Sequence, residues 1–138
     1  MKIISWNVNG LKSCCRKGFF HFLADTMPDV LCCQEIKTLC YLNTPGYLQY
    51  WNPAERPGYS GTLTLVRKEP LSCVFGMGKK ELDREGRLIT LEYKDFYILN
   101  AYVPNINPHN PPDRPDYRLE WEKELRKFVS KLSKPRRI

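Results

Sequence analysis

The chain has 138 residues, of which 42% are hydrophobic and 12% aromatic, and it carries a formal net charge of +7. This length fits one domain with its own hydrophobic core, and the composition is that of a folded globular protein. Apolar runs stay well short of the ~20 residues of a membrane-spanning helix, and the first seven residues become polar too early for a secretory signal. We therefore expect a soluble, intracellular protein with no membrane partner.

Apolar runs bounded by turn residues predict six strands and one short helix before residue 104. The helix covers residues 17–26, where Phe19, Phe22 and Leu23 recur at helical spacing. Residues 52–61 are rich in Pro, Gly and Asn and predict an exposed loop. The predicted strands cover residues 2–8, 30–35, 47–51, 62–67, 87–93 and 96–103.

The C-terminal part of the sequence predicts a loop, a helix and the start of a strand. The prolines between residues 104 and 115 exclude a helix or a central strand there. Beyond them, one apolar stripe with steps of three or four residues predicts a helix, and residues 136–138 read as entry into another strand. The stripe consists of Tyr117, Trp121, Leu125, Phe128 and Leu132. Strands flanked by helices indicate an α+β layered domain.

Two further patterns concern charge and sulfur. From residue 114 onward, nine Lys or Arg face four Asp or Glu, which suggests a polyanionic partner, although a solvated helix face explains much of this surplus. The six cysteines contain no Cys-x-x-Cys spacing, so we interpret them as small buried thiols in a reducing compartment. They are Cys14, Cys15, Cys32, Cys33, Cys40 and Cys73.

Polar side chains follow several of the predicted strands at the point where each strand ends. Asn7 and Asn9 end the first strand, Glu35 ends the second, and Tyr102 and Asn105 end the last. A carboxylate with carboxamides beside it suits Mg²⁺, which prefers oxygen ligands and takes one or two protein carboxylates. The alternative is that these residues only cap strands and satisfy turns.

Four short motifs in order along the chain carry a resemblance to a known family. In this order and spacing they resemble exonuclease III and its AP-endonuclease relatives, within the endonuclease/exonuclease/phosphatase superfamily. Together they extend over most of the chain, which makes the resemblance specific. The motifs are ISWNVNGL at residues 4–11, LCCQEIK at 31–37, GYSG at 58–61 and YVPN at 102–105.

The resemblance implies roles for particular residues. Glu35 matches the glutamate that binds Mg²⁺, for which Mn²⁺ can substitute, and Asn7 matches the asparagine beside this metal. Tyr102 matches the catalytic tyrosine, whose hydroxyl lies close to the scissile phosphate. A further set matches substrate-binding positions on the DNA, namely Asn9, Tyr59, Arg87 and Asn105.

The resemblance also implies a fold and a domain. We expect residues 1–138 to form the N-terminal portion of one domain, a partial four-layer α/β/β/α sandwich of the DNase I-like type. The sequence has neither the family's Gly-Asp-x-Asn motif nor its late Asp-His pair, so we expect a C-terminal half to be needed to complete the domain. A half sandwich is further expected to leave an apolar sheet face uncovered.

The function implied by the resemblance is that of a magnesium-dependent DNA-repair nuclease. It would hydrolyse phosphodiesters of double-stranded DNA at abasic sites or 3′ ends, with this chain inactive by itself, and it would be cytoplasmic and nucleoid-associated in a prokaryote. One alternative is a non-catalytic DNA-binding fragment. Another is a phosphoesterase of the same superfamily that acts on a different phosphodiester, but the motifs at residues 9–11 and 102–105 favour the DNA branch.

Overall fold

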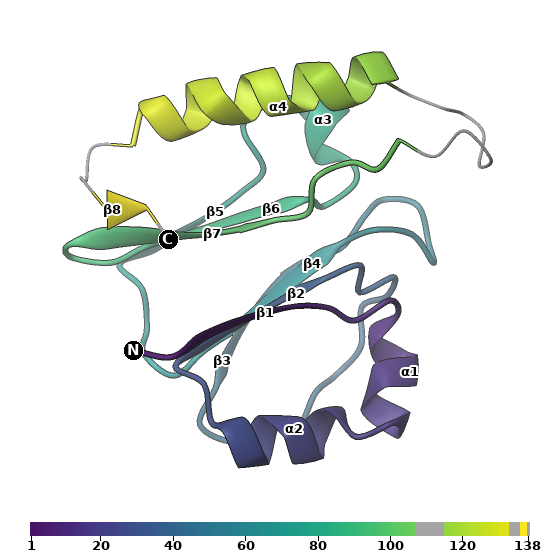
Figure 1. Cartoon of the computed structure of the whole chain (residues 1–138), viewed down its shortest axis with the longest axis vertical. Coiled ribbons are helices and arrows are strands. Elements are labelled where there is room, and N and C mark those ends of the chain that lie inside the picture. The colour runs from purple at the N-terminus through teal and green to yellow at the C-terminus, as the bar shows by residue number, and fades with distance from the viewer. Residues whose placement is uncertain (107–114, 133–135, 138) are drawn as a thin grey trace.

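The computed structural model describes residues 1–106, 115–132 and 136–137, the last pair by backbone only. Eight strands in this part of the chain form two four-stranded sheets (Figure 1). In the first sheet the order is β1 (Ile3–Asn7), β2 (Val30–Gln34), β4 (Thr62–Val66) and β3 (Leu48–Asn52). In the second sheet the order is β5 (Ser72–Phe75), β6 (Leu88–Glu92), β7 (Phe96–Ala101) and β8 (Arg136–Arg137).

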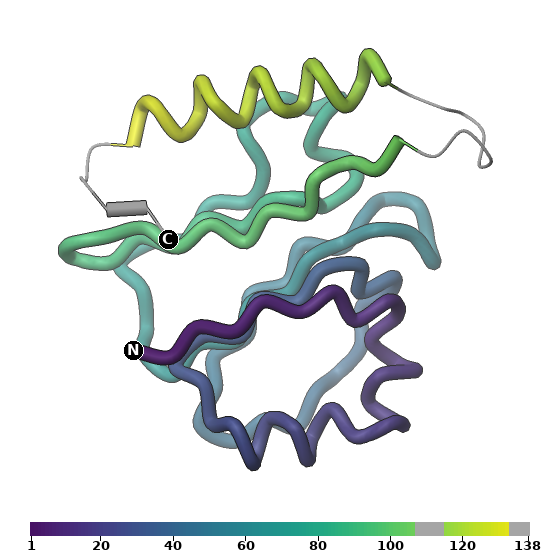
Figure 2. The backbone as a smooth tube through the Cα atoms, viewed as in Figure 1, coloured from purple at the N-terminus to yellow at the C-terminus, as the bar shows by residue number. Residues whose placement is uncertain are grey.

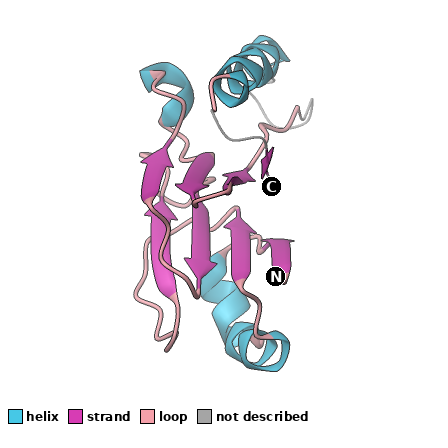
Figure 3. Ribbon diagram, turned by 90° about the vertical axis from the view of Figure 1, so that its left-hand side faces the viewer, coloured by secondary structure: helices cyan, strands magenta, loops and turns pink. Residues whose placement is uncertain are grey.

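The two sheets pack face to face and helices cover their outer faces (Figures 1 and 2). Helices α1 (Leu11–Arg16) and α2 (Phe19–Thr26) lie under the first sheet. Helices α3 (Lys80–Asp83) and α4 (Pro115–Ser130) lie over the second. The side view in Figure 3 shows the strands of both sheets between these two helical layers, so the described residues build an α/β/β/α sandwich.

Strand β2 shows why this layering follows from the sequence. It is parallel to β1 and antiparallel to β4, and all five of its residues are buried. Successive side chains of a strand point to opposite faces, so a strand covered on both faces is mostly apolar, and in β2 only the last residue, Gln34, is a strongly polar one. Leu31 and Cys33 belong to the core under α1 and α2, whereas Val30 and Cys32 belong to the core between the sheets.

One end of the layer between the sheets is polar. Asn100 of β7 is 1% exposed and its side chain lies between β2 and β4. Its Oδ1 accepts a hydrogen bond of 2.8 Å from Gln34 Nε2. Its Nδ2 donates to the Leu63 carbonyl and to Thr64 Oγ1, both at 3.0 Å. Buried amides are tolerated only when satisfied, so this network fixes how the sheets meet.

The structure confirms the six predicted strands within two residues at each end, together with the strand after residue 135 and the helix of the apolar stripe. It corrects the expectation of an uncovered sheet face, because the chain supplies strands to both sheets and their faces cover each other. Helix α4 begins at Pro115, where the absence of an N–H costs nothing. The expected loop between residues 107 and 114 lies outside the described residues.

Three elements are absent from the sequence-based prediction. Helices α1 and α3 have six and four residues, too few to show a helical period. Strand β5 is an edge strand with a mostly exposed face, so its sequence lacks the apolar alternation of a buried strand. None of the helices in the described part of the chain is long and apolar enough to cross a bilayer.

Replacing Asn100 with alanine is expected to lower the free energy of unfolding by about 2–4 kcal/mol. The buried Leu63 carbonyl and Thr64 hydroxyl would each lose a hydrogen bond, and Gln34 would lose its contact across the sheets while keeping those with Ser5 and the Cys32 carbonyl. Urea unfolding followed by circular dichroism measures this difference. Asn43→Ala, at an exposed asparagine, serves as the matched control and should change the midpoint little. Equal midpoints for the two variants would contradict the role given to Asn100.

Candidate active site

The site forms where strands of both sheets end at one pole of the sandwich. Glu35 directly follows β2 and adopts a φ of +58°, and Lys37 has a φ of +59°. Such left-handed conformations are unfavourable for non-glycine residues and persist when surrounding contacts enforce them. Two backbone hydrogen bonds do so here: Gly10 N donates to the Glu35 carbonyl at 2.8 Å, and Lys37 N donates to the Ser60 carbonyl at 2.9 Å.

The Glu35 carboxylate is the centre on which the other groups converge. Asn7 Nδ2 and the Tyr102 hydroxyl each donate a hydrogen bond of 3.0 Å to Glu35 Oε2. Lys37 Nζ lies 2.9 Å from Oε1 of the same carboxylate. The donors come from β1, from the loop after β2, and from the residue after β7, so both sheets contribute to one site. The Glu35 side chain is 22% exposed and stays accessible to a ligand.

Asn9 orients two of these donors. Its backbone N–H donates to Asn7 Oδ1 at 3.0 Å, which directs the Asn7 amide nitrogen towards Glu35. Its side-chain oxygen accepts a hydrogen bond of 2.6 Å from Lys37 Nζ. Asn9 has a φ of +43°, a conformation that asparagine tolerates better than most residues. The structure therefore joins Asn9 to Asn7 and Lys37 beside Glu35, while contact between Asn9 and a substrate stays a prediction.

Competing effects set the charge of Glu35. Burial would raise the pKa of its carboxyl, but hydrogen bonds from Lys37, Asn7 and Tyr102 outweigh burial and lower that pKa below the usual 4.5. The carboxylate is consequently ionised at neutral pH. The reverse holds for its phenol partner: burial, reinforced by the Glu35 carboxylate, raises the pKa of Tyr102 to about 12, so Tyr102 acts as a hydrogen-bond donor.

The side chains present fit one kind of metal site. Within the part of the chain that the structure describes, no three His, Cys, Asp or Glu side chains cluster as ligands. The site instead offers one ionised carboxylate with carboxamides beside it. This oxygen-rich donor set suits Mg²⁺ or Mn²⁺, because Mg²⁺ binds through few protein carboxylates and keeps several waters.

Arg87 is buried between Glu85 and the two tyrosines of the site. Its side chain is 3% exposed, and its Nε donates to Glu85 Oε2 at 2.7 Å. Its other nitrogens reach the Tyr102 carbonyl at 3.0 Å and the Tyr59 hydroxyl at 3.2 Å. The guanidinium carbon lies 4.6 Å from the centroid of the Tyr102 ring. Direct contact with DNA stays a prediction, whereas the observed contacts position both tyrosines.

The remaining predicted residues lie around this centre. The Tyr59 ring has the exposed Arg56 guanidinium 5.4 Å from its centroid. A cavity of about 280 Å³ next to Tyr59 also borders Lys37. Asn105 is exposed, and none of the described residues hydrogen-bonds to its side chain. Glu85 was not among the predicted site residues; its position two residues before Arg87 is the one local signal of their ion pair.

The fold and the site together define the class of protein. Residues 4–137 match the family described as "Endonuclease/Exonuclease/phosphatase family", and the chain belongs to this family. The expectation from the four motifs is thereby confirmed, as is the fold class.

Individual relatives narrow the comparison. An exodeoxyribonuclease of Bacillus subtilis is 39% identical over all of this chain and 56% of its own length. A "DNA-(apurinic or apyrimidinic site) endonuclease" of Dictyostelium discoideum is 42% identical over 96% of this chain and 38% of its own length. Among solved structures, an AP endonuclease from Archaeoglobus fulgidus has a TM-score of 0.74 and 26% identity over 95% of this chain and 51% of its own. The chain thus spans about half the length of these relatives.

Lys37→Gln is expected to raise the pKa of Glu35, because Lys37 provides the strongest of the interactions that lower it. A ¹³C NMR titration of the Glu35 carboxyl measures the change. A lowered folded-state pKa stabilises the fold above the unfolded value, and this effect is lost as pH falls through the folded value. The variant should therefore be less stable than wild type near neutral pH, and the difference should vanish at low pH. Lys12→Gln, at an exposed lysine, removes the same charge elsewhere and serves as the control. Identical titration curves of Glu35 in Lys37→Gln and in wild type would contradict the contact between Lys37 and Glu35.

Proposed function

We propose that this chain provides the metal-binding and phosphate-binding part of a magnesium-dependent DNA-repair nuclease active site. The proposed reaction is hydrolysis of DNA phosphodiesters at abasic sites or 3′ ends. The observation that carries the proposal is the Glu35 carboxylate, held by Asn7, Lys37 and Tyr102 from both sheets. The Bacillus relative, an exodeoxyribonuclease, and the Dictyostelium relative, an apurinic or apyrimidinic site endonuclease, support the substrate class.

The described residues divide the chemistry as follows. Glu35 and Asn7 would hold Mg²⁺, which when bound neutralises the charge that develops on the phosphate. Tyr102 keeps its proton, so its hydroxyl can donate to a phosphate oxygen once the substrate replaces Glu35 as its acceptor. Arg87 holds Tyr102 and Tyr59 in place, and fixed donors stabilise a transition state better than mobile ones do.

Activation of the attacking water is the step for which these residues offer no good candidate. The lowered pKa of Glu35 makes its carboxylate a weak base, and the carboxylate is engaged with Asn7, Lys37 and Tyr102. Tyr102, with a pKa of about 12, is almost wholly protonated at neutral pH. General-base help contributes about 10²–10⁴-fold, so we propose that the 138 residues alone do not hydrolyse DNA measurably.

DNA binding without hydrolysis is a second candidate function, and the same lack of a water-activating base favours it. The basic surplus after residue 114 and the exposed Arg56 beside Tyr59 would then serve phosphate contacts alone. Such binding is independent of sequence and weakens steeply as salt rises. The two candidate functions differ in one outcome, which is whether this chain nicks DNA once a C-terminal half completes the domain.

We expect Mn²⁺ to bind at Glu35 with a dissociation constant no tighter than about 1 mM, because a single carboxylate gives little affinity. Paramagnetic broadening of NMR signals near Asn7 and Glu35 measures this binding. In Glu35→Gln the broadening should disappear at the same Mn²⁺ concentration, whereas Glu55→Gln, at an exposed carboxylate, should leave it unchanged. Equal broadening in wild type and Glu35→Gln would contradict the proposal that Glu35 binds the metal.

The nuclease proposal is tested with a duplex that contains one abasic site, in the presence of Mg²⁺. The 138-residue chain should not nick it. A chimera of this chain with the C-terminal part of the Bacillus subtilis relative, beyond the matched region, should nick it, and Glu35→Ala in the chimera should abolish nicking. Robust Mg²⁺-dependent nicking by the chain alone would contradict the proposal that these 138 residues lack a group that activates the attacking water. A chimera that folds and binds the duplex without nicking it would favour the second candidate.

A further inference from the structure

Lys37 places an ammonium group beside the carboxylate at the centre of the site. Asn7 and Tyr102 donate hydrogen bonds of 3.0 Å to one oxygen of Glu35, Oε2. Lys37 Nζ lies 2.9 Å from the other oxygen, Oε1. The carboxamide and the phenol are neutral, so the negative charge of Glu35 is compensated by Lys37. A divalent ion that binds this carboxylate therefore meets an oxygen that already has a cation beside it.

The ammonium group of Lys37 has a second partner that does not depend on Glu35. Lys37 Nζ donates a hydrogen bond of 2.6 Å to Asn9 Oδ1. The backbone N–H of Lys37 donates to the Ser60 carbonyl at 2.9 Å, which holds the main chain of this residue in place. The side chain itself is 36% exposed and has room to turn. The ammonium group can therefore leave Oε1 and remain bonded to Asn9.

The balance of charge decides which cation stays on the carboxylate. When no divalent ion is bound, the charges of Glu35 and Lys37 cancel. If a divalent ion and the ammonium group shared this one carboxylate, the two cations would repel each other at short range. Arg87 does not alter this balance, because its guanidinium is paired with Glu85 at 2.7 Å. The divalent ion is therefore bound most favourably when the ammonium group moves away from Oε1.

We propose that Lys37 is an exchangeable counter-ion of Glu35, which a divalent cation displaces from Oε1 and which Asn9 then retains in the site. Lys37 thereby keeps the carboxylate compensated without a metal and lowers the affinity for the metal. The alternative role, in which Lys37 orients the carboxylate for the metal, would raise that affinity. The two roles thus differ in the sign of one measurement. The proposal rests on the metal site of the proposed function.

The test is an NMR titration of the 138-residue chain with Mg²⁺ at neutral pH, followed by the ¹³C carboxyl signal of Glu35 and the ¹³Cε signal of Lys37. The ionic strength is held constant, because added salt alone weakens an ion pair. We expect the two signals to move with the same midpoint, since binding at Glu35 and release of Lys37 are one event. A Glu35 signal that moves while the Lys37 signal stays fixed would overturn the proposal.

Removal of the ammonium group determines the sign of its effect. Lys37→Gln should bind Mg²⁺ about three- to tenfold tighter than wild type, because the ion no longer displaces a cation. Glu35 remains ionised in this variant, since even the ordinary pKa of a glutamate lies far below neutral pH. Lys37→Arg keeps the charge and should bind no tighter than wild type. An affinity of Lys37→Gln equal to or weaker than that of wild type would overturn the proposal.

A control variant separates displacement from a general effect of net charge. Lys94→Gln loses the same charge at an exposed lysine in the turn between β6 and β7, whereas Tyr102 follows the other end of β7. This variant should bind Mg²⁺ with the affinity of wild type. Equal tightening in Lys94→Gln and Lys37→Gln would show only an effect of net charge and would also overturn the proposal.

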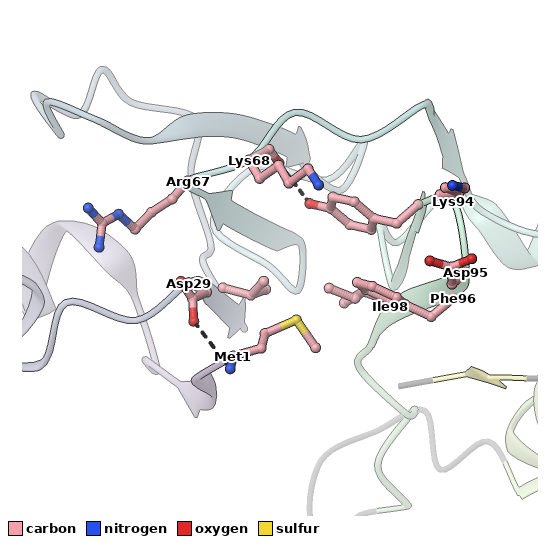
Figure 4. A pocket seen from close by; sticks show the side chains of 10 residues that line it. Met1, Asp29, Arg67, Lys68, Lys94, Asp95, Phe96 and Ile98 are labelled. Atoms are coloured by element: carbon pink, nitrogen blue, oxygen red, sulfur yellow. Dashed lines mark hydrogen bonds and ion pairs between the residues drawn. The ribbon is translucent and has the colours of Figure 1, made fainter.

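Asp29 provides an internal reference in the same spectra. It precedes β2, whereas Glu35 follows this strand, and its Oδ2 lies 3.9 Å from the Met1 ammonium (Figure 4). Weak association of Mg²⁺ with any carboxylate would move the Asp29 signal as well. A Glu35 response no larger than that of Asp29 in every variant would contradict the metal site and the exchange together. A larger Glu35 response with equal affinity in wild type and Lys37→Gln would contradict the exchange alone.

Discussion

The hydrogen bond between Gln34 and Asn100 is the constraint on which the site depends. It joins the two sheets within the polar end of the layer between them, and each partner is buried. Because a buried amide without its partner costs free energy, the sheets are held to the one register in which these amides meet. Glu35 is the residue after Gln34 and Tyr102 lies two residues beyond Asn100, so the same register brings the carboxylate and the phenol within 3.0 Å.

The electrostatics of the site follow from this meeting of the sheets. Glu35 gains donors from both sheets, and these lower its pKa despite burial. Tyr102 loses acidity because it is buried and faces an anion. Arg87 lies buried beneath the Tyr102 ring and is neutralised by Glu85, so a cation supports the site without blocking the carboxylate. A divalent cation would therefore approach a carboxylate that is ionised, accessible and already oriented.

The family resemblance implied one site for Asn7, Glu35 and Tyr102, and the structure brings the three together. The plain apolar pattern of the strands before them placed each one at a strand end. The sequence could not predict the burial of Arg87, since no local pattern distinguishes an arginine paired under a tyrosine ring from one in water. The sequence also did not predict that the two sheets cover each other. Strand β5 is short and mostly exposed, so its sequence gives no clear sign that it belongs to a second sheet. Contacts between segments far apart in the sequence, such as that of Lys37 with Asn9, could not be predicted, because they depend on how the loops pack in the folded protein.

The central claim is that the packing of the two sheets creates the environment of Glu35. The most direct measurement is the pKa of the Glu35 carboxyl in Tyr102→Phe, followed by ¹³C NMR and compared with wild type. The phenylalanine keeps the ring over Arg87 and removes only the hydroxyl that reaches Glu35. The account predicts a higher pKa for Glu35 in the variant, because one donor to its charged form is lost. Identical titration curves would contradict it, since the second sheet would then contribute nothing to this carboxylate.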